Sequence, residues 1–495
     1  MGNFTKKINT HLLLFIFILS CGNSYAQNNT FKYAVEVGGY YSTNNKIPFW
    51  LRSNQYGAIP TADNTVLFRQ SIESKLDTSN KFFKKNFCFD MVTVVGAQAK
   101  IIIPEAYYRI DLGKVAITAG RKKQIYGLVD STLSSGSISW SGNALPIPEI
   151  KISIPEYRRL FFDWFAVKGH FSHGWFGNQD YVKNYFLHQK SLYARIGKPN
   201  SKLKLYGGIL HNAQWGGTPK YTVPVDDPRY IEGGFAKDWV AFRNIVFPLI
   251  NPGYDSTSGY SRYDYENRFG NHLGQIDMGG ELNFKNLKIL GYKQIIFETG
   301  QTFSSLTNID DGLYGLSFEN KKENPIFKKV VFEFLHTTNQ GIYRAGLLRL
   351  IGFYGKHYGT NQNFYFNHGQ YLDGWSYNDQ TIGTPFMIPD PEIRSEKRTP
   401  WDNFLVNNNR IKALYTGVHT KLNSVDLEFK MSLSRNFGSP RFEQFGTADQ
   451  TSFAVKASIP AVKMKGLINV GIGIEQGDLI NDNYGFSVTF KRFWE

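Results

Sequence analysis

The chain has 495 residues, a formal net charge of +15, 16% aromatic residues and a mean hydropathy of −0.33. Beyond the N-terminus no segment approaches roughly 18 consecutive apolar residues, which excludes a helical membrane protein. The length also exceeds one ordinary soluble core. A β-barrel fits these limits, because its apolar membrane-facing residues alternate with polar residues and form no long apolar run. Aromatic girdles at both membrane interfaces also suit such a barrel. An aromatic-rich soluble β-protein is the alternative.

The first residues predict an export signal. Lys6 and Lys7 precede an apolar stretch from Leu12 to Leu19, and small residues surround Ser24-Tyr25-Ala26. We therefore expect cleavage near Ala26, with residues 1–26 removed and residues 27–495 forming one exported unit. A lipoprotein site at Cys21 is the alternative interpretation of the same segment.

Cleavage at this site has consequences for redox state and charge. Only Cys88 remains, so no intrachain disulfide is expected. Subtracting the two signal lysines from +15 leaves +13, and a basic surface attracts anionic partners. For an exported chain we expect outer-membrane lipid, lipopolysaccharide phosphates or an acidic polysaccharide, and no nucleic acid. Scattered solvated lysines are the alternative explanation.

The C-terminal segment predicts a membrane-spanning strand. Tyr484, Phe486, Val488 and Phe490 alternate with small or polar residues before the chain ends at Phe493-Trp494-Glu495. Period two is what a strand needs when one face meets lipid and the other a wet interior. A terminal strand that ends in aromatics also resembles the assembly signal of outer-membrane barrels.

Alternation recurs along the chain. The clearest hairpin runs from Ala413 to Ser434 with a tight turn at Asn423-Ser424, and its second strand should turn Val425 to Leu433 outward at every second residue. Similar patterns follow Phe165 to Ser172, Phe453 to Ile459 and Ile468 to Ile474.

Two long irregular stretches separate these strands, at residues 216–271 and 355–409. Loops this long are usually functional or disordered. Within the first, Phe235, Trp239, Phe242 and Val246 have helical spacing, so we expect one short helix that packs on the barrel wall or rim.

At roughly 25 residues per strand and connection, the mature chain predicts about 16 to 20 strands. A barrel that wide is not filled by wall side chains, so it is plugged or it conducts. Residues 28–90 have mixed patterning, and Val66 to Leu76 is compatible with a short helix. We expect this segment to contribute to a periplasmic plug.

Enzyme and metal signatures are weak. There is no G-x-S-x-G, H-E-x-x-H or standard phosphate-binding glycine loop. His170 and His173 lie three apart on a strand, so they point to opposite faces and cannot share a metal unless a bulge intervenes. Asp226-Asp227 and Asp310-Asp311 are either Ca²⁺ ligands or solvated turns, and we favour solvated turns. We expect no enzyme activity, cofactor or metal.

Seven segments resemble the Wzi family of capsule-assembly proteins, in the form typical of Bacteroidetes-like sequences. In order they are PFWLRSNQYG (48–57), SSGSISWSGNALPIPEIKISIPEY (134–157), VKGHFSHGWF (167–176), LHQKSLYARIGKP (187–199), LYGGILHNAQWGGTP (205–219), FEFLHTTNQGIY (332–343) and FYFNHGQYLDGWSYNDQTIGTPF (364–386). The resemblance implies an outer-membrane barrel of about 18 strands with a small helical plug. It also implies a lectin-like role in attaching capsular polysaccharide to the cell surface.

Sugar recognition needs aromatic rings for the C–H faces of a pyranose and planar polar groups for its hydroxyls. Such mixtures predict ten glycan-binding candidates; the same residue types also form girdles and cap turns. The candidates are Trp140, Asn143, His211, Trp215, Asn367, His368, Tyr371, Asp373, Trp375 and Tyr377.

The sequence therefore predicts an all-β protein, a large antiparallel transmembrane β-barrel with a small helical plug. We expect it to be a monomer in the outer membrane that binds capsular polysaccharide or exopolysaccharide without catalysis. A diffusion porin is the main alternative, and an outer-membrane enzyme is a third.

Overall fold

The structure is a computed structural model that describes residues 31–62, 64–75, 82–96, 99–221, 227–231, 234–248, 260–341, 363–398, 404–442 and 445–494. The expected signal peptide, its cleavage site and Cys21 lie outside these residues. Cys88 is described as a free, buried cysteine.

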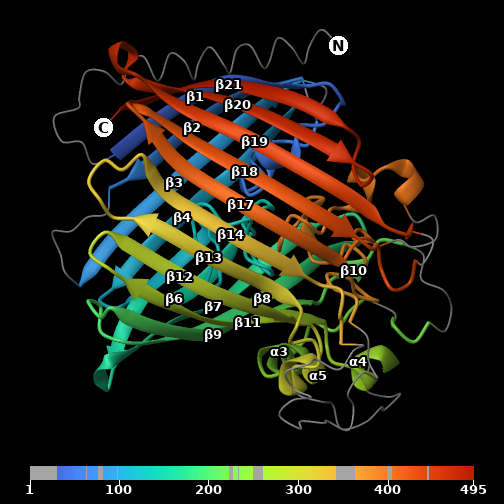
Figure 1. Cartoon of the computed structure of the whole chain (residues 1–495). Coiled ribbons are helices and arrows are strands. Elements are labelled where there is room, and N and C mark those ends of the chain that lie inside the picture. Colours follow the sequence, from blue (N-terminus) through green and yellow to red (C-terminus); the bar gives the residue numbers. More distant parts are fainter. Residues whose placement is uncertain are drawn as a thin grey trace.

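Antiparallel strands form a closed cylinder (Figure 1). Eighteen of them build the wall, as expected, and the two-residue β10 (Thr218–Pro219) pairs with the start of β8. The wall strands are β1 (Phe31–Ser42), β2 (Thr65–Ser74), β3 (Phe83–Val95), β4 (Lys100–Leu112), β5 (Val115–Arg121), β6 (Glu149–Leu160), β7 (Phe162–Asn178), β8 (Val182–Ile196), β9 (Leu203–Trp215), β11 (Asn271–Asn283), β12 (Leu287–Phe297), β13 (Gly312–Asn320), β14 (Phe327–His336), β17 (Ile411–Leu422), β18 (Val425–Asn436), β19 (Ala448–Ala461), β20 (Gly466–Gly477) and β21 (Asn483–Trp494).

Pairing of the first and last strands closes the wall. β1 runs antiparallel to β21, from Tyr33 opposite Trp494 to Ser42 opposite Gly485. Every wall strand therefore has a hydrogen-bonded neighbour on both sides, and no strand edge is left open.

The predicted alternation sets the two faces of the wall. Tyr484, Phe486 and Val488 of β21 are exposed on the outer face, while the residues between them are buried inside. The predicted hairpin is confirmed in register, with Ala413 opposite Ser434 and Leu422 opposite Val425. His170 and His173 face opposite sides of β7, as predicted.

The two ends of the barrel differ in their connections. Short turns such as residues 113–114, 284–286 and 423–424 join strands at one end, which we call the short-turn end. Residues 43–64, 122–148, 216–270 and 337–410 join strands at the other, the long-loop end. Outer-membrane barrels carry short turns on the periplasmic side and long loops outside the cell.

In the described part of the chain, helices are few and short. They are α2 (Phe49–Arg52), α3 (Trp239–Val246), α4 (Arg262–Glu266), α5 (Gly300–Ser305) and the 3-10 turns η2 (Asp390–Glu392), η3 (Ser395–Lys397) and η5 (Val462–Met464). The predicted helix near Trp239 is confirmed as α3. Figure 1 shows α3, α4 and α5 gathered at the long-loop end. No helix among the described residues has the length and apolar character needed to cross a bilayer.

Loops from the long-loop end fill the interior. Their buried residues belong to one large hydrophobic cluster that includes Trp50, Ile138, Trp375 and Met387. The helical part is small: α2 is buried inside, where the Trp50 indole N–H donates to Ser432 Oγ of β18 at 2.9 Å. The plug also contains a short hairpin of two strands with two residues each, β15 (Ser376–Tyr377) and β16 (Gln380–Thr381).

Polar wall residues anchor the plug. Gln294 Oε1 accepts the backbone N–H of Ile138 at 2.8 Å, and Gln275 Oε1 accepts that of Ser139 at 3.0 Å. Glu333 accepts the Ser135 N–H at 2.7 Å. These bonds satisfy backbone groups that a buried loop otherwise leaves without partners.

Three sequence-based expectations are wrong. Val66 to Leu76 does not contribute a helix: residues 65–74 form β2 of the wall. Most of the described part of segment 28–90 likewise forms β1, β2 and β3, and only residues 43–64 enter the interior. Asp311 is not solvated, because it is fully buried and accepts N–H groups from Asn339 and Gln340.

Candidate functional site

Three connections converge at the long-loop end. They are the short segment 179–181 after β7, the loop that carries α4, and the loop that contains residues 363–398. Gln370 joins two of them, because its side-chain N–H groups donate to Arg229 O at 3.0 Å and to Asp264 Oδ1 at 3.1 Å. The N-cap Ser261 holds α4 in place by accepting the Asp264 backbone N–H at 3.1 Å.

A group of aromatic side chains and one arginine lies at this junction. We call it the rim cluster, and its members are Tyr181, Tyr221, Arg229, Tyr230, Tyr263 and His368. All six are neither fully buried nor fully exposed. Their rings are thus fixed by neighbours while part of each surface meets solvent.

Ring contacts order the cluster. Tyr221 and Tyr230 meet edge to face with centroids 5.7 Å apart, and their hydroxyls are hydrogen-bonded. Tyr263 meets His368 at 5.5 Å and 87°. Arg229 connects the two halves, since its guanidinium lies 5.2 Å from the Tyr230 centroid and also donates to Gly369 O at 3.4 Å.

Charge in the cluster comes from one arginine–aspartate pair. Arg229 Nε lies 2.9 Å from Asp227 Oδ1, and Nη2 lies 2.5 Å from Oδ2. This hydrogen bonding lowers the pKa of the Asp227 carboxyl. Burial lowers the pKa of His368, so that ring is neutral at pH 7. The cluster therefore offers ring faces, a guanidinium and an ionised carboxylate.

Eight of the ten sequence-predicted residues lie inside the barrel mouth, mostly as parts of the plug. Trp375 is 0% exposed and Tyr371 1% exposed, so neither presents a free ring face. Trp140 packs edge to face on Trp375 at 6.0 Å. The Tyr377 hydroxyl accepts a hydrogen bond from Arg121 at 2.8 Å.

The polar members of this group bind backbone. Asp373 accepts N–H groups from Tyr181 at 3.0 Å and Val182 at 2.9 Å, which fixes the start of β8. Asn367 donates to Val406 O at 2.7 Å, and Asn143 donates to Thr381 O at 3.1 Å. Of the ten, His368 alone belongs to the rim cluster.

His211 and Trp215 lie apart from the other eight. Both are on the outward face of β9, so the barrel wall separates them from the plug. Trp215 packs under α3 with Ala241 and Ile245. His211 Nε2 lies 2.9 Å from His272 Nδ1 of β11.

Sequence reasoning missed the other five members of the rim cluster. The loop that supplies Tyr221, Arg229, Tyr230 and Tyr263 stands out as long and tyrosine-rich. Its partner residues are remote, however: the Arg229 contact with Gly369 spans 140 positions. Within the described part of the chain, no group of three or more His, Cys, Asp and Glu side chains is arranged to hold a metal ion.

Solved structures with a similar fold include outer-membrane β-barrels. One similar structure is Wzi of Escherichia coli, an outer-membrane protein involved in group 1 capsule assembly and described as a carbohydrate-binding β-barrel. It matches with a TM-score of 0.56 and 13% identity, over 92% of this chain and 83% of Wzi. The chain has the fold of an outer-membrane β-barrel.

Further similar structures have lower scores. OccAB4 of Acinetobacter baumannii matches with a TM-score of 0.44 at 8% identity, over 94% of this chain and 99% of its own. OccD3 of Pseudomonas aeruginosa matches with a TM-score of 0.43 at 7% identity, over 94% and 91%. No protein-family model matches the sequence, and no curated protein does.

Proposed function

We propose that this chain is an outer-membrane protein that binds capsular polysaccharide or exopolysaccharide at the cell surface and helps to attach it there, without making or breaking covalent bonds. One observation carries the proposal: a plugged barrel presents the rim cluster at the end where barrels of this class carry their extracellular loops. The likeness of its fold to the carbohydrate-binding barrel Wzi supports the same role.

The chemistry of the rim cluster suits a glycan. Half-exposed rings such as Tyr230 and Tyr263 pack against pyranose C–H faces, and the Arg229–Asp227 pair hydrogen-bonds to sugar hydroxyls. Among the ten residues predicted from sequence, we propose direct contact for His368. The buried residues, such as Trp375 and Asp373, support the surface by holding the plug.

Location and partners follow from the outer wall and the net charge. The exposed apolar residues of the wall would contact membrane lipid, and the surplus of +13 that remains without the two signal lysines would favour lipopolysaccharide phosphates or an acidic glycan. A closed wall has no strand edge to pair with a second copy, so we propose a monomer. Residues 1–26 would be removed on export.

Retention of polysaccharide tests this role in the cell. A deletion strain should shift polysaccharide from the cell-bound to the shed fraction, and the wild-type gene should restore it. Purified protein should bind the extracted polysaccharide, and Arg229→Ala or Tyr230→Ala should weaken that binding about tenfold.

The matched control is Arg435→Ala. Arg435 also forms a bidentate pair, with Asp449 at 2.8 Å, but its guanidinium lies over no aromatic ring in the described part of the chain. It should leave both retention and binding at wild-type levels. Unchanged retention in the deletion strain would rule out the attachment role.

A diffusion porin is the competing proposal, favoured by charged residues on the inner wall such as Lys430 and Lys456. Planar bilayers separate the two functions. A polysaccharide-binding protein with a closed plug should give no large steady conductance, whereas a porin should conduct. Steady conductance by the wild-type protein would favour the porin.

A further inference from the structure

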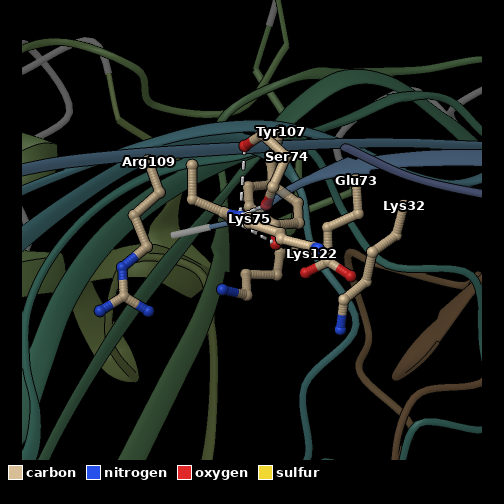
Figure 2. A pocket seen from close by; sticks show the side chains of 8 residues that line it. Lys32, Glu73, Ser74, Lys75, Tyr107, Arg109 and Lys122 are labelled. Atoms are coloured by element: carbon tan, nitrogen blue, oxygen red, sulfur yellow. Dashed lines mark hydrogen bonds between the residues drawn. The ribbon is translucent and has the colours of Figure 1, made fainter. Parts of the chain in front are cut away.

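A cavity of about 520 Å³ lies at the short-turn end, far along the strands from the rim cluster. Eight residues from the first strands of the wall and the start of the plug line it (Figure 2): Lys32, Glu73, Ser74, Lys75, Asn86, Tyr107, Arg109 and Lys122. Its volume falls within the range of small-molecule sites.

Strand alternation shows that this cavity is inside the barrel. Tyr33 of β1 and Tyr108 of β4 are exposed on the outer face. Their neighbours Lys32 and Tyr107 therefore point to the lumen. The cavity therefore faces the lumen and not the lipid.

The lining has more positive than negative charge. Glu73 is its one carboxylate against four cationic residues. Arg109 is paired, with its Nε 2.6 Å from Asp111 Oδ1. Among the described residues no carboxylate lies within ion-pair distance of Lys32, Lys75 or Lys122.

Lys122 is the most constrained of these cations. Its ammonium lies 4.4 Å from the Tyr107 ring centroid and is partly buried at the first position after β5. Burial lowers the pKa of this ammonium, and the nearby charges of Arg109 and Lys151 lower it further. An anion in the cavity would supply the ion-pair partner that no described carboxylate gives Lys122.

Neutral hydrogen bonds hold one side of the cavity rigid. Asn86 Nδ2 donates to the Ser74 carbonyl at 2.6 Å, and the Tyr107 hydroxyl donates to Asn86 Oδ1 at 2.8 Å. These bonds tie β2, β3 and β4 together across the cavity wall. A preformed wall lowers the ordering cost of binding.

Lys122 also borders a second cavity, with Tyr56 and Trp140, whose volume is only about 10 Å³. That volume holds about one water molecule at most. A sugar therefore fits the first cavity and not the second.

We propose that the 520 Å³ cavity binds an anionic sugar, carrying a phosphate or carboxylate group, that enters from the short-turn end. Lys32, Lys75 and Lys122 contact the anionic group, because ammonium groups make strong charge-assisted hydrogen bonds to such oxygens. The hydroxyls of the sugar meet Glu73 and the polar wall. This site does not depend on glycan binding at the rim cluster.

Titration of purified protein in detergent tests the site, with glucose 6-phosphate and glucuronate as probes and glucose as the neutral comparison. We expect at least one anionic sugar to bind and glucose not to bind. Lys122→Gln and Lys32→Gln should each weaken binding about tenfold. Added salt should also weaken it.

Lys463→Gln is the control variant, because Lys463 is an exposed lysine in η5, a turn outside the cavity lining. It should bind as the wild type does. Lys32 is exposed, so its substitution should leave the barrel folded even if Lys122→Gln does not. Failure of both anionic sugars to bind at millimolar concentration would overturn the proposal. Equal binding of inorganic phosphate and glucose 6-phosphate would overturn the assignment to a sugar.

Discussion

The Trp375 indole N–H donates to the Ser139 carbonyl oxygen at 2.7 Å, and this bond joins two loops that lie 236 positions apart in the sequence. Trp375 is fully buried and packs edge to face on Trp140 and on Phe176 of β7. The bond therefore lies where the two main plug loops and the wall meet.

Replacing Trp375 should loosen the plug. Trp375→Ala removes a fully buried ring and leaves the Ser139 carbonyl without its donor, and such large-to-small changes cost about 3–5 kcal/mol. We expect the wall to persist and the plug loops to move, which should raise conductance in planar bilayers. Trp239→Ala, at a tryptophan 73% exposed outside the wall, should leave conductance unchanged. If Trp375→Ala gives no conductance above that of the wild type, other contacts keep the pore closed.

Glu333 of β14 should be an anchor for the loop at 122–148. It accepts hydrogen bonds from the Ser134 hydroxyl at 2.6 Å, the Ser135 N–H at 2.7 Å and the Tyr292 hydroxyl at 2.5 Å. Glu333→Ala leaves buried donors without an acceptor, at about 1–3 kcal/mol each. Limited proteolysis should then cut this loop, which the wild type protects.

Glu319 of β13 offers the matched comparison. It also lies on the inner wall, but its carboxylate pairs with Lys288 of β12 and Lys329 of β14, which are wall residues, and not with the plug. Glu319→Ala should keep the loop resistant to protease. Cleavage at equal rates in both variants would contradict an anchoring role for Glu333.

Asp373 should make stability depend on pH in a narrow window. Burial raises the pKa of this carboxyl to about 6, although two backbone N–H groups partly oppose the shift. The folded protein then holds a proton between pH of about 4 and 6 that the unfolded chain has released. Stability therefore falls as pH rises through this window, by at most about 1.4 kcal/mol per unit, and levels off above it.

Heat unfolding in detergent micelles at several pH values measures this dependence. Asp373→Asn removes the titration while retaining one side-chain oxygen as an acceptor. The difference in melting temperature between wild type and variant should change between pH 4 and 6 and be constant above. A constant difference across the whole range would show that Asp373 is already ionised at pH 4.

Alternation predicted wall strands at several segments whose inner face is polar. The Ala413 to Ser434 hairpin is such a case, because Lys430 and Ser432 face the interior opposite outward Met431 and Leu433. Segment 66–76 gave a wrong prediction for a physical reason. Leu67 of β2 faces inward against the apolar plug while Val66 faces outward, so both faces are apolar at the start of the strand and period two is lost there.

The rim cluster was beyond prediction for a different reason. Its contacts join Tyr263 of one loop to His368 of another, and Tyr181 to Tyr221 across separate connections. No local spacing encodes these pairs, because the wall between the loops sets their distance. The sequence identified the loops and the residue types, and folding selected the pairs.

Helix α3 should lie in the membrane interface. Ala241 and Ile245 on its inner side are fully buried against outward-facing residues of β9, while Trp239 and Phe247 are exposed on the outside of the barrel. Tryptophan in such a position belongs to an aromatic girdle. In vesicles that contain brominated lipid, Trp239 should therefore supply a large share of the quenchable fluorescence, whereas Trp375 inside the plug should supply little. Trp239→Phe should lower the quenched fraction and Trp375→Phe should not. A quenched fraction that is the same in Trp239→Phe and wild type would place α3 away from the lipid.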